Sequence, residues 1–499
     1  MLVERLVEHA AAHPERLALV AAGQQVTYGQ LLRKVVAAAL QLQSLGVQTG
    51  DRVVLAASAT PAFVYGYLGC HYRGAVAVPV DPKISQQRLE QIAAIAQPRA
   101  VFLARKISAS PDWRSIEDLS SGPAGSLDPV TARADRIADL LFTSGTTGQP
   151  KGVMLSHAAI MAAADYINAF IGNTAADREV VPLPLSHSFG LGRLRCNLLA
   201  GGTLIVVDGF MSPGDLLSAL ADWNATGLAC VPAGFAVLFK TSGSKLGGFR
   251  SKLRYIEIGS AAMPLEHKRR LMSLLPETRI CMHYGLTEAS RSAFIEFHGA
   301  SDRLDSIGKP SRDVELRIVD ADGSDCATGQ MGRVVIKSPA MMSGYWQDPD
   351  GTAQAFLGDY LISGDVGHRD EDGFLFLDAR EKELINVGGR EVSPVEIETL
   401  LEMHPAVGEA ACIGVPDPQG VTGMAVKAFL VARPGVEAPK STVLAKHLRG
   451  KIEPYKMPRE YEWIAELPRT ASGKLQRVRL AEQAAGAAAE ARTEPETAT

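Results

Sequence analysis

The chain has 499 residues, of which 46% are hydrophobic and 21% charged. This composition is typical of a globular enzyme, and the length allows about three domains. The net charge of −4 gives no indication of binding to nucleic acid or to an anionic membrane surface. No apolar run is long enough to span a bilayer, no signal peptide is evident, and the six cysteines show no metal-like pairing. We therefore expect a cytoplasmic protein with reduced thiols.

The first part of the chain alternates predicted strands with predicted helices. Apolar runs predict buried strands at 17–20, 53–56 and 75–78. Apolar residues at helical spacing predict one helix between Thr27, its N-cap, and Gly46, and a second over 61–73. Such alternation predicts right-handed crossovers and a parallel sheet covered on both faces. Ligands of these sheets bind beyond the carboxyl ends of the strands.

A loop rich in hydroxyl groups and glycine follows the apolar run 140–142. Its members, in order, are Thr143, Ser144, Gly145, Thr146, Thr147 and Gly148, and it ends in Pro150-Lys151-Gly152. Glycine permits close backbone approach, successive N–H groups form an anion-binding concavity, and the lysine adds a positive charge. The loop therefore suits a polyphosphate, although its spacing is not that of the Walker loop. A flexible linker is the alternative, but linkers rarely follow a strand and end in Pro-Lys-Gly.

The remainder of the chain predicts further strands and a change of character near its end. Residues 107–135 predict a surface loop, and further strands are predicted at 202–207, at 228–231 and in several short runs between 300 and 345. After Arg380 a capping box at 393–396, with proline at the first helical position, begins a helix. Strands at 410–415 and 425–431 and a helix at 441–449 follow.

We therefore expect an α/β protein with three parts. Residues 1–380 form a large N-terminal domain of parallel α/β sheets with a β-rich subdomain, and 381–481 form a small mobile α+β domain. Residues 482–499, rich in Ala, Glu and Thr, have little to pack and are expected to be a disordered tail.

The loop that ends at Lys151 resembles the phosphate-binding signature of the adenylate-forming superfamily. This superfamily includes acyl-CoA synthetases, luciferases and the adenylation domains of peptide synthetases. Further stretches match its motifs in the same order, at 184–190, 284–288, 363–365, 380–382 and 468–474. Because the matches run from the first third of the chain almost to its end, the chain is identified as similar to AMP-dependent acid–thiol ligases of the acyl-CoA synthetase type.

The resemblance implies an ATP site. By analogy the phosphates lie against the loop residues Thr143, Ser144, Gly145, Thr146 and Thr147 and against Lys151. Glu288 resembles the Mg²⁺-associated glutamate, and Thr287 the threonine that bonds the phosphate; a helix N-terminal pair is the alternative for these two alone. The adenine is assigned to the stacking residue Tyr284, to His283 beside it, and to the turn of Gly259, Ser260 and Ala261. Asp365 resembles the carboxylate that accepts bonds from both ribose hydroxyls, and Arg380 a second ribose or phosphate contact.

Other matched positions are implied to act on the acid and the thiol. Lys474 resembles the lysine that bonds the carboxylate and phosphate oxygens during adenylation, since a flexible stem with three donors suits that task. His187 resembles the histidine that gates the acyl site, and Phe189 and Gly285 are assigned to the acyl pocket. Lys382 falls at the hinge about which relatives rotate the C-terminal domain. The other orientation presents Gly388 and Gly389 to the CoA thiol.

Two departures from the pattern occur near the hinge. Asn386 stands where many relatives carry lysine, and Ala379 replaces a common glycine. Neither change removes a group needed for adenylation, but Asn386 leaves the details of the thiol step open.

The sequence also bears on the acid. Amino-acid-activating relatives hold the substrate ammonium with an aspartate, whereas this chain has Ser-His-Ser-Phe at 186–189; an unpaired buried ammonium would be costly. Acetate-class pockets are closed by tryptophan, whereas 282–284 read Met-His-Tyr. We therefore expect a medium- or long-chain fatty acid or an aryl acid. Arg291 either meets a polar group of the substrate or lies in a surface ion pair, and we favour the ion pair.

The leading hypothesis is an acyl-CoA synthetase that uses ATP, Mg²⁺ and coenzyme A. It converts the acid into acyl-AMP and then into acyl-CoA, AMP and pyrophosphate. Loading the phosphopantetheine thiol of a carrier protein is the alternative, although no carrier domain is evident in the chain. A non-catalytic nucleotide-binding protein is a third hypothesis, against which the set Lys151, Glu288, Asp365 and Lys474 argues.

Overall fold

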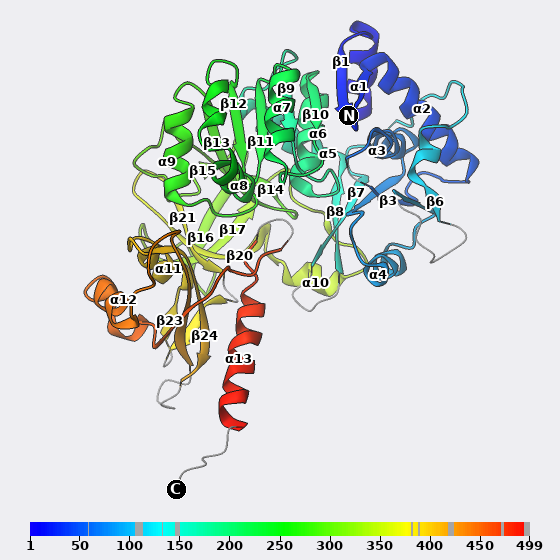
Figure 1. Ribbon diagram of the computed structural model, residues 1–499. Coiled ribbons are helices and arrows are strands. Elements are labelled where there is room, and N and C mark those ends of the chain that lie inside the picture. Colours follow the sequence, from blue (N-terminus) through cyan, green and yellow to red (C-terminus); the bar gives the residue numbers. More distant parts are fainter. Residues whose placement is uncertain are drawn as a thin grey trace. The chain divides into compact units, whose positions relative to one another are not determined.

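The computed structural model describes residues 1–57, 59–104, 113–131, 133–144, 150–380, 383–387, 390–417, 424–470 and 474–493. The chain divides into two compact units (Figure 1). Unit 1 consists of residues 1–316 and 335–361, and unit 2 of residues 317–334 and 362–499. Unit 2 contains the predicted C-terminal domain but begins before the predicted boundary at 380. It also includes residues 317–334 and 362–380, and helix α11, Pro394–Glu402, packs on the strand that ends at Arg380. A functional hinge at 380–382 stays a prediction.

A nine-stranded sheet forms one half of unit 1 among the described residues, in the order β15-β14-β13-β12-β11-β9-β10-β1-β2. The strands are β1 Leu17–Ala21, β2 Gln24–Thr27, β9 Arg178–Val181, β10 Thr203–Val206, β11 Gly227–Cys230, β12 Tyr255–Ile258, β13 Arg279–Leu286, β14 Ser290–Glu296 and β15 Lys309–Pro310. The middle of this order is parallel, as predicted. It consists of strands β13, β12, β11, β9, β10 and β1. The edge strands β2, β14 and β15 are antiparallel.

A second sheet, seven-stranded over the described ranges, has the order β18-β8-β7-β4-β3-β5-β6. The strands are β3 Arg52–Ala56, β4 Val76–Val80, β5 Ala100–Leu103, β6 Arg114–Ser115, β7 Ile137–Ser144, β8 Pro150–Ser156 and β18 Gly344–Tyr345. Strand β7 is parallel to β4 and antiparallel to β8. The predicted phosphate loop therefore joins a hairpin and begins at the carboxyl end of a strand that runs parallel to its neighbour, as expected.

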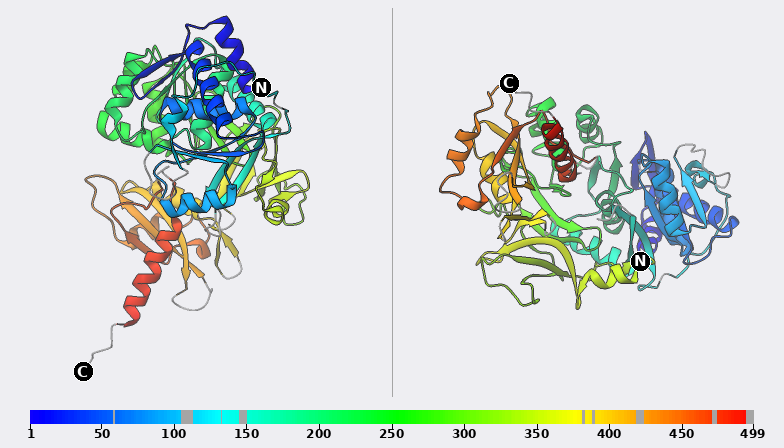
Figure 2. Two further views of the ribbon diagram at one scale, coloured as in Figure 1. Left: turned by 90° about the vertical axis from the view of Figure 1, so that its right-hand side faces the viewer. Right: turned by 90° about the horizontal axis from the view of Figure 1, so that it is seen from below.

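Helices cover the sheets of unit 1. They are α1 Leu2–Ala12, α2 Tyr28–Ser44, α3 Pro61–Arg73, α4 Gln86–Ala96, α5 His157–Ile171, α6 Ser188–Ala200, α7 Pro213–Asp222, α8 Pro232–Ser242, α9 Leu265–Leu274 and α10 Pro349–Gln354, with 3₁₀ turns at Ile116–Leu119 and Lys245–Phe249. The helices α2 and α3, drawn in blue in Figure 2, pack against each other. Thr27 caps α2 as predicted by accepting from Gln30 N–H. The turn at 116–119 buries Ile116 and Leu119, so the predicted surface loop over 107–135 was wrong at this point.

The remaining strands include a five-stranded sheet with the order β16-β17-β20-β19 and with β21 on β20, a hairpin β22–β23 and a three-stranded sheet β24-β25-β26. Their bounds are β16 Glu315–Val319, β17 Gly332–Lys337, β19 Phe356–Leu357, β20 Tyr360–Arg369, β21 Leu375–Arg380, β22 Ile385–Val387, β23 Arg390–Val392, β24 Val407–Pro416, β25 Met424–Ala432 and β26 Glu460–Trp463. The helices of this part are α11 Pro394–Glu402, α12 Ser441–Leu448 and α13 Arg477–Thr493, with a 3₁₀ turn at Pro454–Lys456. An α/β fold with a small α+β domain near the end of the chain is confirmed.

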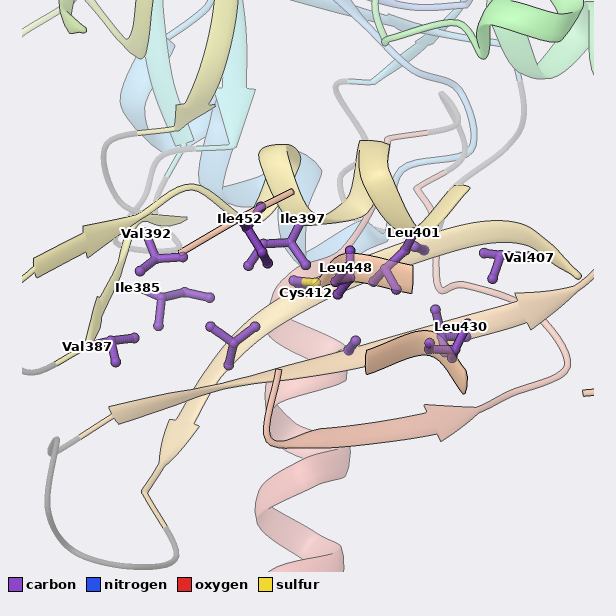
Figure 3. Close-up of a cluster of buried hydrophobic side chains, with 14 residues drawn as sticks. Ile385, Val387, Val392, Ile397, Leu401, Val407, Cys412, Leu430, Leu448 and Ile452 are labelled. Atoms are coloured by element: carbon purple, nitrogen blue, oxygen red, sulfur yellow. The ribbon is translucent and has the colours of Figure 1, made fainter. Parts of the chain in front are cut away.

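Unit 2 has its own apolar core (Figure 3). Ile397 and Leu401 of α11 pack with Cys412 of β24, Leu430 of β25 and Leu448 of α12. Ser393 Oγ caps α11 as the capping box predicts. The prediction of a disordered tail from 482 differs from the structure, in which α13 continues to Thr493. The alanine-rich sequence has high helix propensity, and Leu480 and Ala484 pack in a second small core. None of the described helices combines the length and apolar character needed to cross a bilayer.

Candidate active site

Two of the predicted ATP motifs meet at the carboxyl edge of the nine-stranded sheet. β12 and β13 are parallel neighbours, with Ile258 opposite Met282. The turn 259–261 therefore emerges beside the segment 284–288. Ser260 has a φ of +75°, a conformation that L-residues adopt rarely and that is concentrated at functional sites. Tyr284 is buried at this edge.

The His283 ring supports this turn from behind. A Cβ atom added to Gly259 would lie 2.0 Å from the His283 ring, so only glycine fits there. The ring also meets Phe189 edge-on, with 4.7 Å between centroids, and its Nδ1 lies 2.8 Å from Glu257 Oε1. Burial lowers the pKa of His283. The structure thus places His283 between the predicted adenine turn and the predicted acyl residue Phe189, and direct contact of His283 with ATP stays a prediction.

A fully buried cluster of charges lies beneath these residues. Arg193 of α6 pairs with Glu179 of β9 at 2.7 Å and with Glu257 of β12 at 2.9 Å. Burial acts to raise the pKa of Glu257, but the guanidiniums of Arg291 and Arg193 outweigh it and hold that pKa below its usual range. Asn197 of α6 also donates to Glu179.

Arg291 belongs to this cluster, so the prediction of a surface ion pair was wrong. Its side chain is 5% exposed, and its Nε lies 3.2 Å from Glu257 Oε1. Its terminal nitrogens donate to the carbonyl oxygens of Ser188 at 3.3 Å and Phe189 at 3.1 Å. Arg291 therefore ties the first turn of α6 to the strand that precedes the adenine turn.

Lys151 and Glu288 come together on the two sides of Tyr345. The Lys151 ammonium lies 4.7 Å from the centre of the Tyr345 ring, and the Tyr345 hydroxyl donates to Glu288 Oε1 at 3.2 Å. The Lys151 Nζ is also 3.9 Å from Asp348 Oδ2. Thr143 lies directly opposite Lys151 across the β7–β8 hairpin. Lys151, at the end of the predicted phosphate loop, and Glu288, the predicted metal ligand, therefore both contact Tyr345.

Backbone bonds around β18 fix this arrangement. At one end of the segment, Met342 N–H donates to the Glu288 carbonyl at 2.7 Å, and at the other Trp346 N–H donates to the Gly152 carbonyl at 2.7 Å. A short stretch of chain thus connects the end of β13 with the start of β8, although the two strands belong to different sheets.

This donor set fits a magnesium ion that arrives with a nucleotide. Over the described residues no group of three or more His, Cys, Asp or Glu side chains could hold a metal by itself. Mg²⁺ characteristically uses one or two protein carboxylates and completes its shell with phosphate oxygens and water. The half-buried Glu288 carboxylate, bonded by the Tyr345 hydroxyl, offers such an oxygen ligand.

His187 lies beside the residue that follows β4, at the carboxyl end of that strand. It is the N-cap residue of α6, its side chain is 55% exposed, and its Nε2 lies 3.4 Å from Asp81 Oδ2. The hydrogen bond from His187 lowers the pKa of Asp81. Asp81 follows β4 directly, so this aspartate holds the predicted gating histidine at the carboxyl edge of the seven-stranded sheet.

A cavity opens beside Thr287. Its polar lining residues are Thr287, Ser290, Ser188, Arg195 and Arg291, and its apolar lining comes mainly from α5 residues Ala159, Ile160, Ala163, Ala164 and Ile167. Gly285 is exposed at a bulge in β13, where a Cβ atom would meet the Ser290 carbonyl oxygen at 1.8 Å. The assignment of Gly285 to the acyl pocket stays a prediction.

Unit 2 carries three further predicted residues. Asp365 of β20 is buried and lies directly opposite Arg380 of β21 in the antiparallel register. The two predicted ribose residues are therefore neighbours in one hairpin. Lys474 has an exposed side chain at the end of its loop.

Several predicted positions lie outside the described residues. These are Gly145, Thr146, Thr147, Lys382, Gly388 and Gly389, together with the side chains of Ser144 and Arg380. Their roles stay predictions.

Sequence reasoning did not find four residues that shape the site: Asp81, Glu257, Tyr345 and Asp348. Two of them could have been noticed, because Asp81 follows a predicted strand and Glu257 is a charge within the apolar run 255–258. Tyr345 and Asp348 carry no such signal, since their relation to Lys151 arises only from strand pairing.

Comparison with known proteins agrees with this geometry. A family model described as "AMP-binding enzyme" matches residues 6–346, and one described as "AMP-binding enzyme C-terminal domain" matches residues 396–474. The 2-succinylbenzoate–CoA ligase of Bacillus velezensis is 32% identical, over 97% of this chain and 99% of its own. The fatty acid–[acyl-carrier-protein] ligase ScoC of Streptomyces coeruleorubidus is 30% identical, over 96% and 95%.

A solved relative shows similarity at the level of the whole fold. The o-succinylbenzoate CoA synthetase (MenE) of Bacillus subtilis, in complex with the acyl-adenylate intermediate OSB-AMP, has a TM-score of 0.85 and 27% identity, covering 95% of this chain and 97% of that one. The same enzyme in complex with ATP and magnesium ion has a TM-score of 0.84 and 27% identity, covering 96% and 99%.

Proposed function

The chain belongs to the family of AMP-binding enzymes, and on that premise we propose that it is an AMP-forming acid–thiol ligase. It joins a carboxylic acid to the α-phosphate of ATP and transfers the acyl group to coenzyme A. The single observation that carries this proposal is the meeting of Lys151 and Glu288 around Tyr345.

The first half-reaction brings two anions together. A carboxylate oxygen attacks the α-phosphorus, and the bond from that phosphorus to the bridging oxygen breaks, so that pyrophosphate leaves with the electron pair. Charge on phosphoryl oxygens must be neutralised and the reactants aligned. Lys151 supplies a fixed cation, and Glu288 would hold Mg²⁺, which supplies further neutralisation when bound. Lys474 is proposed to bond the carboxylate and phosphate oxygens in this step.

The second half-reaction forms the thioester. The CoA thiol gives up its proton to solvent, its sulfur attacks the acyl carbon, the bond from that carbon to the AMP oxygen breaks, and AMP leaves with the electron pair. We propose that rotation at Lys382 exchanges the Lys474 loop for the loop of Gly388 and Gly389, so that one cleft serves both half-reactions. A cytoplasmic location is part of the same proposal.

An apolar acid of the fatty or aryl class is the proposed substrate. The cavity beside Thr287 supports this, because Thr287, a predicted catalytic residue, lines it together with apolar side chains of α5. A carboxylate can stay with Thr287 while an apolar tail lies along α5 and leaves water.

Filling this cavity should reduce activity on the acid alone. Ala163→Leu adds bulk to the apolar wall, and overpacking of this kind costs roughly 1–3 kcal/mol. We expect kcat/KM for a medium-chain or aryl acid to fall by about tenfold, with KM for ATP unchanged. Ala169 is exposed on the same helix, so Ala169→Leu is the matched control and should behave as wild type. If Ala163→Leu and Ala169→Leu have the same kcat/KM for the acid, the acid does not bind in this cavity.

A carrier-protein thiol is the alternative acceptor, favoured by the 30% identity to a ligase of acyl-carrier protein. Enzyme, acid and ATP are incubated with either CoA or a phosphopantetheinylated carrier protein, and each thioester is measured. We expect the CoA thioester to form faster. If the carrier protein is loaded faster instead, the carrier protein and not CoA is the acceptor.

A further inference from the structure

The loop that ends in Lys474 is closed at its base by hydrogen bonds between two short segments. Thr470 N–H donates to the Lys474 carbonyl at 2.8 Å, and Gln476 N–H donates to the Pro468 carbonyl at 2.8 Å. Lys474 N–H donates to Thr470 Oγ1 at 3.1 Å. The main chain at Lys474 therefore moves with these two segments, and its position depends on what anchors them.

Arg477 anchors the segment that follows Lys474. Its Nη1 and Nη2 donate to the two oxygens of Glu398 at 2.6 and 3.0 Å, and its Nε donates to Glu383 Oε2 at 2.8 Å. The Arg477 side chain is 15% exposed and that of Glu398 is 11% exposed. Such a bidentate, charge-assisted pair is stronger and more directional than a neutral hydrogen bond.

Glu398 is itself fixed to the core of unit 2. It lies on α11, whose apolar face packs in the cluster of Figure 3, and its Oε1 accepts from Cys412 N–H of β24 at 2.6 Å. In the segment before Lys474, Arg469 pairs with Glu409. Both of those side chains are more than 40% exposed, so solvent screens this pair.

We propose that Arg477 is a positioning residue for adenylation, because it joins the Lys474 loop to Glu383, the residue directly after the predicted hinge Lys382. The Arg477 fork joins Glu383, α11 and the base of the loop into one rigid body. Rotation at the hinge then delivers Lys474 to a fixed place. This inference rests on the role that the proposed function gives Lys474.

The geometry predicts that lysine cannot replace Arg477. An ammonium is a point donor on a flexible stem, whereas the planar guanidinium bonds three carboxylate oxygens in fixed directions. Arg477→Lys keeps the charge but cannot span both glutamates. Arg477→Gln would leave the Glu398 carboxylate buried beside a backbone donor alone and would put the folding of unit 2 at risk.

Glu383→Ala therefore carries the test, since Glu383 is 36% exposed and its removal leaves the bond between Arg477 and Glu398 in place. Acid-dependent ATP–pyrophosphate exchange reports adenylation, and CoA-dependent consumption of supplied acyl-AMP reports the thiol step, which does not use Lys474. We expect Glu383→Ala and Arg477→Lys to lower the exchange rate by about fivefold, as for one lost charge-assisted hydrogen bond. We expect the thiol step to stay within about twofold of wild type and the Tm of Glu383→Ala to be unchanged.

Two controls separate the possible outcomes. Arg479 is exposed two residues further along α13, and Arg479→Ala should match wild type in both assays. Lys474→Ala must abolish most of the exchange; if it does not, the role of the lysine fails and the inference fails with it. Suppose that Lys474→Ala loses exchange. The positioning role of Arg477 alone is then overturned if Glu383→Ala keeps full exchange, or if Glu383→Ala slows both half-reactions equally.

Discussion

Glu288→Gln should lower the rate of acid-dependent ATP–pyrophosphate exchange by ~10²–10³-fold, the scale of a lost electrostatic contact to a transition state. The amide cannot ligate Mg²⁺ as an anionic oxygen, so charge that develops on the phosphoryl oxygens is left less neutralised. The fold should survive, because the amide oxygen still accepts from the Tyr345 hydroxyl and Met342 still donates to the carbonyl at 288.

Matched variants isolate this effect. Glu277 is exposed in unit 1, so Glu277→Gln should leave exchange unchanged. Tyr345→Phe removes one hydrogen bond to Glu288 and should lower exchange by about fivefold. The Mg²⁺ concentration needed for half-maximal rate should rise in Glu288→Gln. Wild-type exchange with wild-type Mg²⁺ dependence in this variant would remove Glu288 from the metal site.

Arg193→Met should destabilise unit 1 by about 3–5 kcal/mol, the cost of leaving a buried ion pair with one partner. The methionine fills similar space, but the carboxylates of Glu179 and Glu257 lose the cation between them. The free energy of unfolding in urea, followed by the fluorescence of Trp113, Trp223 and Trp346, measures the loss. Arg312 pairs with Asp165 and Asp313 at the surface with 57% of its side chain exposed, so Arg312→Met should cost at most about 1 kcal/mol.

The loss in Arg193→Met should also depend on pH. Burial already raises the pKa of Glu179, and without Arg193 the folded-state pKa of this carboxyl rises further above that of the unfolded chain. The folded variant then binds protons more readily than the unfolded chain, so its deficit is fully present above the folded pKa and shrinks as the pH falls. Unfolding at about pH 7.5 and about pH 5.5 tests this sign. A deficit independent of pH, or equal to that of Arg312→Met, would contradict the account.

The sequence was sufficient to predict the alternation of strands and helices and the strand-end position of the motifs. Local signals carried these predictions: the Thr27 and Ser393 caps, the apolar runs before Gly259 and Thr143, and the change of character after Arg380. Each depends on residues close together in the chain.

Features that depend on tertiary partners were not predictable. Arg291 looks like a surface residue in the sequence, and only the pairing of β12, β13 and β14 with the packing of α6 encloses it with Glu257. Tyr345 meets Lys151 because β18 pairs with β8, about 190 residues earlier in the chain. The structure has a helix beyond 482, where a disordered tail was predicted, because alanine has the highest helix propensity of the residues there.

The measurement that tests the central claim most directly is acid-dependent ATP–pyrophosphate exchange by the full chain over a panel of fatty, aryl and small branched acids. The account predicts exchange that requires both Mg²⁺ and an acid, that is strongest with a medium-chain or aryl acid, and that collapses in Glu288→Gln. A folded wild-type protein that catalyses no exchange with any acid in the panel would contradict it.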